Sequence, residues 1–287
     1  MKLSIGTAQF GLDYGVANSE KKYSQDAVNN LIKLCRSHEV LSLDTAINYG
    51  DSETKLGKAE ISDFQIVTKL PSIPESSIDI KKWIINQVLS SLNRLNVSSV
   101  HGILLHDPSQ LHTDLRDRIL NSLETLQRDG YVKKIGISVY SPQEIEKLSM
   151  IDTFEIIQAP FNIMDRRLDT SGMLNKLSTN GVEIHVRSIF LQGLLVMNPA
   201  KRPDYFKKWS HLLSIWDNWI VDNNLNPIEV CINFIKQFSQ INNCVVGVDN
   251  LHQCHDLISI FSNEVSYDFP KISSEDTNLV NPGNWKF

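Results

Sequence analysis

The chain has 287 residues, of which 41% are hydrophobic and 21% are charged, with a formal net charge of -5 and a pI near 5.9. This composition is ordinary for a globular protein with a large buried core. The mild negative charge and the lack of a basic stripe argue against nucleic acid and against an anionic membrane surface. We therefore expect neither a nucleic-acid partner nor a membrane partner.

The N-terminus and the cysteines favour a cytoplasmic location. The sequence opens with MKLSIGTAQFG, which lacks the long apolar core of a secretory signal. No run reaches the roughly 18 apolar residues that a membrane helix needs. The four cysteines lie in no CxxC arrangement: Cys35, Cys231, Cys244 and Cys254. Reduced cysteines are typical of the cytoplasm.

Short apolar segments alternate with amphipathic segments along the whole chain. The expected strands cover residues 4–8, 41–44, 65–69, 100–105, 134–138, 154–158, 182–187 and 244–248. The expected helices cover residues 24–36, 51–58, 78–95, 115–127, 173–180, 205–221, 227–238 and 251–261, with one more beginning at 141–142. Ser24 is expected to cap its helix and Pro142 to lie in a first turn, while Gly130 and Gly181 end helices.

Eight strands, each followed by a helix, predict an α/β protein with a closed (β/α)8 TIM barrel. The strands are short apolar runs without alternation, as expected for parallel strands that are covered on both faces. Eight such units favour a barrel over a doubly wound sheet. We expect one domain over residues 1–287, with an extra Trp-rich helix at about 205–221 and an irregular tail at about 262–287.

Polar side chains follow three successive strands. Asp44 ends the second strand, with Tyr49 five residues later, Lys69 ends the third and His106 follows the fourth. Alone, each residue has a commoner explanation, such as a structural His, a packed Tyr, a solvated Lys or a capping Asp. An unpaired buried charge is costly, however, and active sites of TIM barrels lie at the carboxyl ends of strands. We therefore expect these four side chains to share one site.

The four residue types divide the chemistry of carbonyl reduction between them. Tyrosine titrates near pH 10, but a nearby ammonium lowers that pKa and a carboxylate keeps the ammonium charged. A tyrosine tuned in this way can donate a proton to a carbonyl oxygen, while a histidine orients the carbonyl. No side chain supplies a hydride, so the reaction requires a nicotinamide cofactor.

The sequence resembles the aldo-keto reductase family over nearly its whole length. The matching segments are GTAQFG, DTAINYGDSE, VTKL, LLHDP, IGIS, IIQAPFN, VRSIFLQGLL and VVGVDNLHQ. The DxAxxYG motif with a downstream Lys and His is the most specific of these signals. The resemblance implies a catalytic tetrad of Asp44, Tyr49, Lys69 and His106, and NADPH or NADH bound without a Rossmann domain.

The resemblance also implies a cofactor site. Ser138 and Gln158 match the residues that hold the nicotinamide amide, segment 188–193 matches the pyrophosphate segment, and segment 248–253 matches the adenosine segment. A loop with Gly6, Gly11 and Gly15 lets backbone approach a ligand closely. The expected cofactor-binding residues are Gly6, Thr7, Ser138, Gln158, Arg187, Ser188, Gln192, Gly193, Val248, Asp249 and Gln253.

Three positions depart from the family's pattern. Val139 replaces a frequent Asn and removes one amide contact. Arg187 replaces the aromatic ring that commonly stacks on the nicotinamide, although a planar guanidinium can also stack. Asp249 lies where many NADPH-using relatives carry a basic residue. A carboxylate repels a 2′-phosphate but accepts a hydrogen bond from a ribose 2′-hydroxyl, so we expect NADH to be used at least as well as NADPH.

A His/Cys cluster and an aromatic cluster also stand out, but neither is expected to form the active site. His252, Cys254 and His255 lack the clear ligand pairs of a zinc site, and we expect no metal. Five aromatic residues at helical spacing predict a helix packed on the barrel, with a substrate-facing lid as the alternative. They are Tyr205, Phe206, Trp209, Trp216 and Trp219.

We expect an NAD(P)H-dependent enzyme that reduces a small-molecule aldehyde or ketone. One alternative is a cofactor-binding regulatory protein with little turnover, which Val139 and Arg187 leave open. Another is a lyase or aldolase that forms a Schiff base on Lys69. The short loop 107–113 predicts an open site for a bulky or polar carbonyl compound, with a sugar or nucleotide-sugar ketone as one guess. The sequence indicates no oligomeric state.

Overall fold

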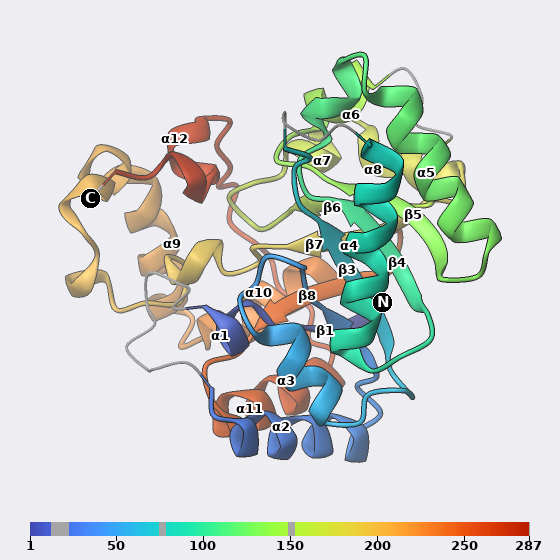
Figure 1. Ribbon diagram of the computed structural model, residues 1–287. Helices are drawn as coiled ribbons and strands as arrows, with labels where there is room; N and C mark the ends of the chain where they lie inside the picture. Colours follow the sequence, from blue (N-terminus) through green and yellow to red (C-terminus); the bar gives the residue numbers. More distant parts are fainter. Residues whose placement is uncertain (13–22, 75–78, 149–152, 287) are drawn as a thin grey trace.

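The computed structural model describes residues 1–12, 23–74, 79–148 and 153–286. Within these residues, eight parallel strands close into a barrel in the order β1 to β8, with helices around it (Figure 1). The predicted (β/α)8 TIM barrel is confirmed. The strands are β1 Lys2–Gly6, β2 Ser42–Asp44, β3 Gln65–Leu70, β4 Val100–Leu105, β5 Val132–Ser138, β6 Ile156–Pro160, β7 Glu183–Arg187 and β8 Asn243–Gly247.

The helices follow the strands as the alternating pattern predicts. The α-helices are α1 Ala8–Gly11, α2 Gln25–Ser37, α3 Ser52–Lys58, α4 Ile80–Leu95, α5 Arg116–Arg128, α6 Pro142–Lys147, α7 Arg167–Thr170, α8 Met173–Thr179, α9 Ser210–Asp222, α10 Pro227–Lys236, α11 Leu251–Ser262 and α12 Thr277–Val280. Short 3-10 helices are η1 Pro108–His112, η3 Leu191–Gly193, η4 Pro199–Lys201, η5 Asp204–Trp209 and η6 Pro282–Asn284. Gly15 and Ile78, which the sequence places in a loop and at a helix start, lie outside the described residues.

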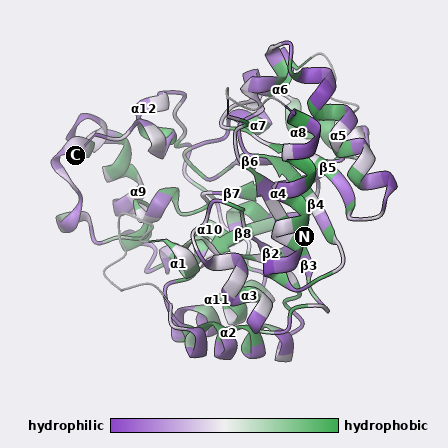
Figure 2. Ribbon diagram, in the orientation of Figure 1, coloured by the Kyte–Doolittle hydropathy of each residue, from purple (hydrophilic) through white to green (hydrophobic). Residues whose placement is uncertain are grey.

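The helices bury one face each against the barrel. In α4, the buried positions Ile84, Val88, Leu92 and Leu95 recur at helical spacing, and Figure 2 shows hydrophobic strands inside more hydrophilic helices. Burying one such side chain stabilises the fold by about 1.5–3 kcal/mol. Ser24 caps α2 by accepting a hydrogen bond from the amide of Ala27, as the sequence predicts.

Strand register brings the carboxyl ends of the strands to one rim of the barrel. Gly6 on β1 pairs with Asp44 on β2, and Asp44 pairs with Val67 on β3. On the other side of β1, Gly6 pairs with Gly247 on β8 and closes the barrel. The amide of His106 donates to the carbonyl oxygen of Leu70 over 3.0 Å, so the chain after β4 stays beside the end of β3.

The first strand and the segments after residue 200 differ from expectation. The expected first strand at 4–8 lies instead at Lys2–Gly6, because residues 8–11 turn into α1. The single helix expected over 205–221 is a 3-10 helix, η5, followed by α9, which ends at Asp222. The tail is not wholly irregular, because α12 and η6 form within it.

The tail packs against the η5–α9 insertion rather than against the barrel mouth alone. Tyr205 donates from its hydroxyl to the carbonyl oxygen of Asn278 over 2.9 Å, and Nε1 of Trp209 donates to Asp276 over 3.1 Å. The rings of Phe206 and Trp285 meet edge-on, with 4.8 Å between their centres. Figure 1 shows α9, α12 and the C-terminus together at one side of the barrel. Three of the five aromatic residues, Tyr205, Phe206 and Trp209, therefore pack against the tail.

In the part of the chain that the structure describes, no helix is both long enough and apolar enough to cross a bilayer.

Candidate active site

Asp44 and Lys69 form a buried ion pair at the ends of β2 and β3. Nζ of Lys69 lies 2.5 Å from Oδ1 of Asp44 and also donates to the carbonyl oxygen of Thr45 over 2.9 Å. Gln158, on β6, donates from Nε2 to the other carboxylate oxygen, Oδ2, over 2.6 Å. The Lys69 side chain is 2% exposed and that of Asp44 6%. Each oxygen of Asp44 therefore has a partner, and the ammonium is held in one place.

Lys69 is charged at neutral pH despite its burial. Desolvation alone would lower the pKa of Lys69, but the carboxylate of Asp44 and the phenolate of Tyr49 outweigh it and raise that pKa. Electrostatic interaction is mutual, so the same ammonium favours the phenolate form of Tyr49.

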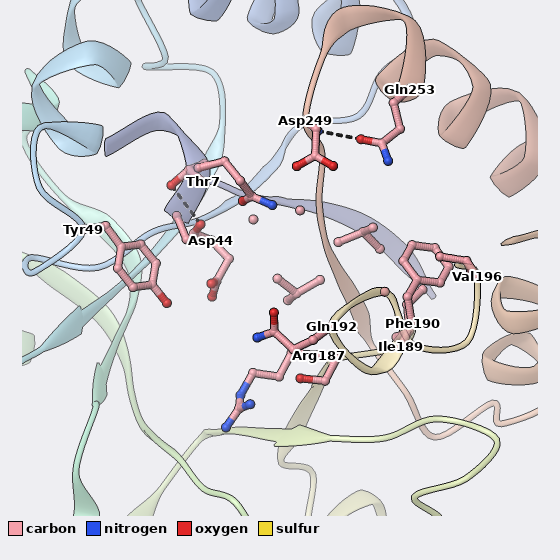
Figure 3. Close-up of a pocket in the computed structure, with 18 of the residues that line it drawn as sticks. Thr7, Asp44, Tyr49, Arg187, Ile189, Phe190, Gln192, Val196, Asp249 and Gln253 are labelled. Atoms are coloured by element: carbon pink, nitrogen blue, oxygen red, sulfur yellow. Dashed lines mark hydrogen bonds between the residues drawn. The ribbon is translucent and has the colours of Figure 1, made fainter. Parts of the chain in front are cut away.

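Tyr49 lies between Lys69 and His106. Nζ of Lys69 is 5.1 Å from the centre of the Tyr49 ring. The rings of Tyr49 and His106 have centres 6.0 Å apart and an interplanar angle of 78°. Burial, followed by repulsion from Lys69, lowers the pKa of His106 to about 4, so its imidazole is neutral at physiological pH. Figure 3 shows the hydroxyl of Tyr49 directed into the cavity between the strand ends.

Two glycines hold the loop that carries Tyr49. A Cβ added to Gly11 would lie 1.9 Å from the carbonyl oxygen of Tyr49, and one added to Gly50 would lie 2.4 Å from the carbonyl oxygen of Gly11. Gly50 also has a φ of 56°, which glycine tolerates best. The hydroxyl of Ser52 donates to both oxygens of Thr7 at 2.9 and 3.0 Å. The GTAQFG and NYG segments therefore pack closely against each other and hold the loop that carries Tyr49.

A cavity of about 210 Å³ opens at this rim (Figure 3). Its lining residues come from the ends of β1, β2, β6, β7 and β8 and from the segments that follow them: Gly6, Thr7, Ala8, Gln9, Asp44, Tyr49, Gln158, Arg187, Ser188, Ile189, Phe190, Gln192, Gly193, Val196, Val245, Val246, Gly247, Asp249 and Gln253. The cavity is therefore bounded by the expected catalytic residues on one side and by the β7 and β8 loops on the other.

The loop after β7 has an unusual backbone. Ser188, Leu191 and Gln192 have φ values of 60°, 47° and 54°, and Gly193 has 92°. Positive φ in non-glycine residues is strained and clusters at functional sites. Asn162 anchors the loop by donating from Nδ2 to the carbonyl oxygen of Ser188 over 3.0 Å. Successive backbone N–H groups in turns of this kind can form concave sites that bind phosphate groups.

The start of α11 forms the far wall of the cavity. The side chain of Asn250 caps this helix by accepting from the amide of Gln253, and Oε1 of Gln253 accepts from the amide of Asp249 over 2.5 Å. Both Asp249 and Gln253 line the cavity. Val248 differs, because its side chain is 1% exposed and its carbonyl oxygen accepts from the hydroxyl of Tyr23.

Arg187 reaches from the end of β7 across the cavity mouth. Its Nη2 donates to the carbonyl oxygen of Val139 over 3.0 Å, and its guanidinium carbon lies 4.4 Å from the centre of the Tyr140 ring. The guanidinium thus lies over the ring of Tyr140, and its stacking on a nicotinamide stays a prediction. Arg187 is one of the residues that line the cavity.

The structure gathers most of the predicted site residues around one cavity. Lys69, His106, Ser138 and Val248 are outside the lining, but Lys69 and His106 contact lining residues directly. Ser138 lies behind Gln158, with 3.5 Å between its Oγ and Oε1 of Gln158. Ile189 and Phe190 belong to the predicted segment 188–193, but sequence reasoning missed other lining residues: Ala8, Gln9, Val196, Val245, Val246 and Gly247. Apart from Gln9, these residues are apolar or small, and their residue types alone do not indicate a ligand site.

Other reactive side chains lie away from this cavity. Among the described residues, no group of three or more His, Cys, Asp and Glu side chains could hold a metal ion. The four cysteines are buried and free, and the sulfurs of Cys35 and Cys254 lie 3.9 Å apart between α2 and α11.

The chain is thus a (β/α)8 barrel with a buried Asp–Lys pair, a Tyr and a His beside a cavity at the carboxyl ends of the strands. The model of the aldo/keto reductase family matches residues 2–274. The chain therefore belongs to the aldo/keto reductase family, which is a family of NAD(P)H-dependent oxidoreductases.

Individual relatives are distant. The chain is 27% identical over 127 residues to L-glyceraldehyde 3-phosphate reductase of Escherichia coli O157:H7, a match that covers 42% of this chain and 36% of that enzyme. Among solved structures, the holo form of aldo-keto reductase AKR11C1 from Bacillus halodurans is similar with a TM-score of 0.74, 18% identity and coverage of 92% and 88% of the two chains. Glycerol dehydrogenase AKR11B4 from Gluconobacter oxydans has a TM-score of 0.70, 19% identity and coverage of 92% and 87%. These structures share the fold.

Proposed function

We propose that this protein is an enzyme that reduces an aldehyde or a ketone to an alcohol with NAD(P)H, with Tyr49 as the general acid. The observation that carries the proposal is the position of Tyr49. Its ring lies beside the Lys69 ammonium and the neutral His106 ring, and it borders the cavity at the carboxyl ends of the strands. A substrate carbonyl in this cavity can reach the phenol.

Residues around the cavity could each hold one part of a dinucleotide. Gly247 adds no side chain to the cavity wall beside Gln9, whose Nε2 would lie 2.5 Å from an added Cβ. Gln158 and Ser138 would hold the nicotinamide amide, the 188–193 loop the pyrophosphate, and the start of α11 the adenosine. When bound, NAD(P)H supplies the hydride that side chains lack.

The protein's own residues move and hold the proton. Asp44 keeps Lys69 charged, and Lys69 stabilises the phenolate that remains after Tyr49 has donated its proton to the carbonyl oxygen. His106 is neutral, so it can donate a hydrogen bond to the same oxygen without adding a second charge. In the reverse direction, the Tyr49 phenolate accepts the proton of an alcohol.

We infer that NADH is used at least as well as NADPH. The carboxylate of Asp249 belongs to the cavity wall at the start of α11. A 2′-phosphate placed there would be repelled, whereas a free ribose 2′-hydroxyl could donate to the carboxylate.

The name of the Escherichia coli relative describes reduction of an aldehyde, which supports carbonyl reduction here. The lyase alternative needs a neutral amine as the nucleophile, and the pairing of Lys69 with Asp44 opposes that. The regulatory alternative fits poorly with a complete and buried Asp44–Lys69–Gln158 network. Buried free cysteines fit the cytoplasmic location that we propose.

One set of assays separates the three readings. NADH or NADPH consumption with a panel of aldehydes and ketones tests reduction, and quenching of tryptophan fluorescence tests cofactor binding. Borohydride trapping in the presence of carbonyl compounds tests for a Schiff base on Lys69. We expect consumption of cofactor and no trapped lysine. Cofactor binding without consumption of any panel member would instead support the regulatory reading.

A further inference from the structure

Arg187 is a cation at the cavity without an acidic partner. Among the residues that the structure describes, no carboxylate lies within ion-pair distance of it, and its one hydrogen bond runs from Nη2 to the carbonyl oxygen of Val139. Its other guanidinium donors are free of protein acceptors in that part of the chain. A guanidinium carries five N–H donors in a planar fork, so most of this fork is available to a ligand.

Arg187 also provides the surplus positive charge at the catalytic end of the cavity. The charge of Lys69 is matched by Asp44 at 2.5 Å. The pKa of His106, lowered by burial, Lys69 and Arg187, keeps its imidazole neutral. Asp249 lies across the cavity from Arg187 in Figure 3 and belongs to the α11 wall. Asp107 also acts on His106, but its carboxylate accepts from Ser72 and Ser109 and forms no ion pair with Arg187 in the described part of the chain.

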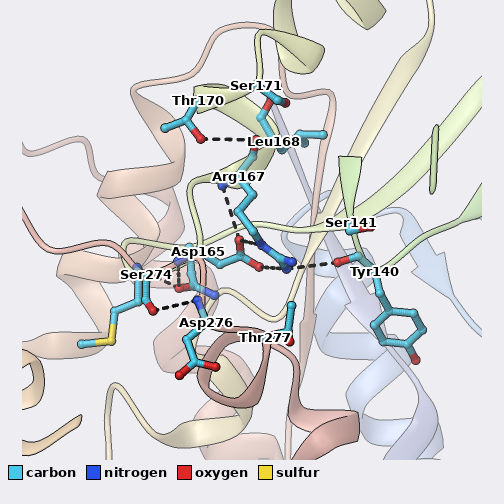
Figure 4. A network of polar contacts seen from close by, with 12 residues as sticks. Tyr140, Ser141, Asp165, Arg167, Leu168, Thr170, Ser171, Ser274, Asp276 and Thr277 are labelled. Atoms are coloured by element: carbon cyan, nitrogen blue, oxygen red, sulfur yellow. Dashed lines mark hydrogen bonds and ion pairs between the residues drawn. The ribbon is translucent and has the colours of Figure 1, made fainter. Parts of the chain in front are cut away.

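A buried ion pair anchors the backbone of Tyr140, whose partly exposed ring contacts Arg187. Arg167 forms a two-pronged ion pair with Asp165, from Nε to Oδ1 over 2.7 Å and from Nη2 to Oδ2 over 2.8 Å. The same Nη2 donates to the carbonyl oxygen of Tyr140 over 3.1 Å (Figure 4). The ring of Tyr140 supports the guanidinium of Arg187 at 4.4 Å. Arg187 is thus positioned before any ligand binds, which reduces the entropic cost of recognition.

We propose that Arg187 determines substrate specificity by binding an anionic group, a carboxylate or a phosphate, on the carbonyl substrate. This inference rests on the carbonyl reduction proposed above and names the class of compound that is reduced. The planar fork of arginine matches both kinds of oxyanion and binds them through charge-assisted hydrogen bonds. An anion bound by Arg187 would place the substrate across the cavity mouth, with its carbonyl directed toward Tyr49.

The test compares pairs of aldehydes in which one member carries an anionic group and the other does not. The first pair is 4-carboxybenzaldehyde and its methyl ester, and the second is glyceraldehyde 3-phosphate and glyceraldehyde. We expect wild-type protein to prefer the anionic member of at least one pair in kcat/KM. Arg187→Met should remove about 10-fold to 100-fold of that preference, mainly through KM, as expected for loss of a hydrogen bond to a charged group. Arg187→Lys should retain part of it.

Arg166→Met is the matched control. Arg166 belongs to the loop after β6, where its guanidinium lies over the Phe234 ring at 4.8 Å, and it is outside the cavity lining. Its removal changes the net charge equally, so the preference for anions should persist. Thermal unfolding of each variant checks that the fold is retained.

Four results would overturn the inference. Equal kcat/KM for charged and neutral partners in wild-type protein would leave carbonyl reduction standing but remove the role of Arg187. An equal loss on both substrates in Arg187→Met, with a matching rise in the Kd of NAD(P)H measured by fluorescence, would assign Arg187 to the cofactor. A loss of anion preference in Arg166→Met as large as in Arg187→Met would assign the effect to overall charge. Reduction of other compounds in the panel, with neither member of either pair reduced by wild-type protein, would contradict a preference for anions. If no compound in the panel is reduced, the proposed function itself fails.

Discussion

The ammonium of Lys69 lies 5.1 Å from the centre of the Tyr49 ring, in a site where both groups are packed against β-strand ends. Asp44 holds this ammonium in place by accepting a hydrogen bond from it over 2.5 Å. The phenol therefore has a positive charge beside it whose position depends on a carboxylate and not on solvent. This arrangement favours loss of the Tyr49 proton to a substrate oxygen.

Replacement of Lys69 by Met should reduce both activity and stability. Loss of the charge that favours the Tyr49 phenolate should lower kcat/KM about 100-fold or more, in the range of general acid catalysis. The buried carboxylate of Asp44 would also lose its counterion, at a cost of about 3–5 kcal/mol in unfolding free energy. Denaturant unfolding and steady-state kinetics measure the two effects.

A double variant separates these two effects. Lys69→Met with Asp44→Asn removes both charges, so it should recover much of the stability but none of the activity. Recovery of activity along with stability would show that Lys69 acts only by supporting the fold.

Gly50→Ala should disturb the catalytic tyrosine, whereas Gly130→Ala should not. Both glycines have positive φ, 56° and 83°, so each substitution carries a backbone cost of roughly 1–2 kcal/mol. The two positions differ in the space around them. A Cβ added to Gly50 would lie 2.4 Å from the carbonyl oxygen of Gly11, whereas one added to Gly130 would have no described atom within 4 Å. Displacing the Tyr49 loop by about 1 Å should lower kcat/KM about 100-fold. Equal kinetics in the two variants would show that this glycine contact does not position Tyr49.

The stability of the protein should depend on His106 in mildly acidic solution. The folded-state pKa of His106 is lowered to about 4 by burial and by Lys69, while an unfolded histidine titrates near 6.5. Between these values the unfolded state binds the proton and the folded state does not. The free energy of unfolding should therefore fall as the pH drops through this window, and the contribution is fully present above about pH 6.5.

His106→Gln provides the comparison, because glutamine does not titrate. Between pH 7.5 and pH 5.0 the wild-type protein should lose about 2 kcal/mol more unfolding free energy than the variant. Urea unfolding at the two pH values measures this difference. Parallel losses would contradict a neutral, buried His106.

Asp249→Arg should change the cofactor preference. In wild-type protein we expect the Kd for NADH to be no higher than that for NADPH. In the variant, a guanidinium in place of the carboxylate should pair with a 2′-phosphate and lower the Kd of NADPH relative to NADH by about 10-fold or more. Fluorescence titration measures both constants. A much lower Kd for NADPH already in wild-type protein would remove Asp249 from the discrimination.

The barrel and the tetrad were accessible from sequence because both rest on local signals. Short apolar runs alternate with amphipathic helices, and Asp44, Lys69 and His106 interrupt that pattern at strand ends, where a charge needs a partner. The contact between Arg187 and the Tyr140 ring could not be predicted from the sequence. Pairing between β5, β6 and β7 brings these two distant residues together. The role of Gln158 as a hydrogen-bond donor to Asp44 likewise depends on contact across the barrel between β2 and β6.

The most direct test of Tyr49 as the general acid is the turnover of Tyr49→Phe, measured as NAD(P)H consumption with the best carbonyl substrate. Tyr131→Phe is the control, because Tyr131 is 37% exposed and does not line the cavity. We predict that Tyr49→Phe loses about 100-fold to 10,000-fold in kcat while its Kd for the cofactor stays at the wild-type value. Wild-type turnover in Tyr49→Phe would contradict the proposal that this phenol supplies the proton.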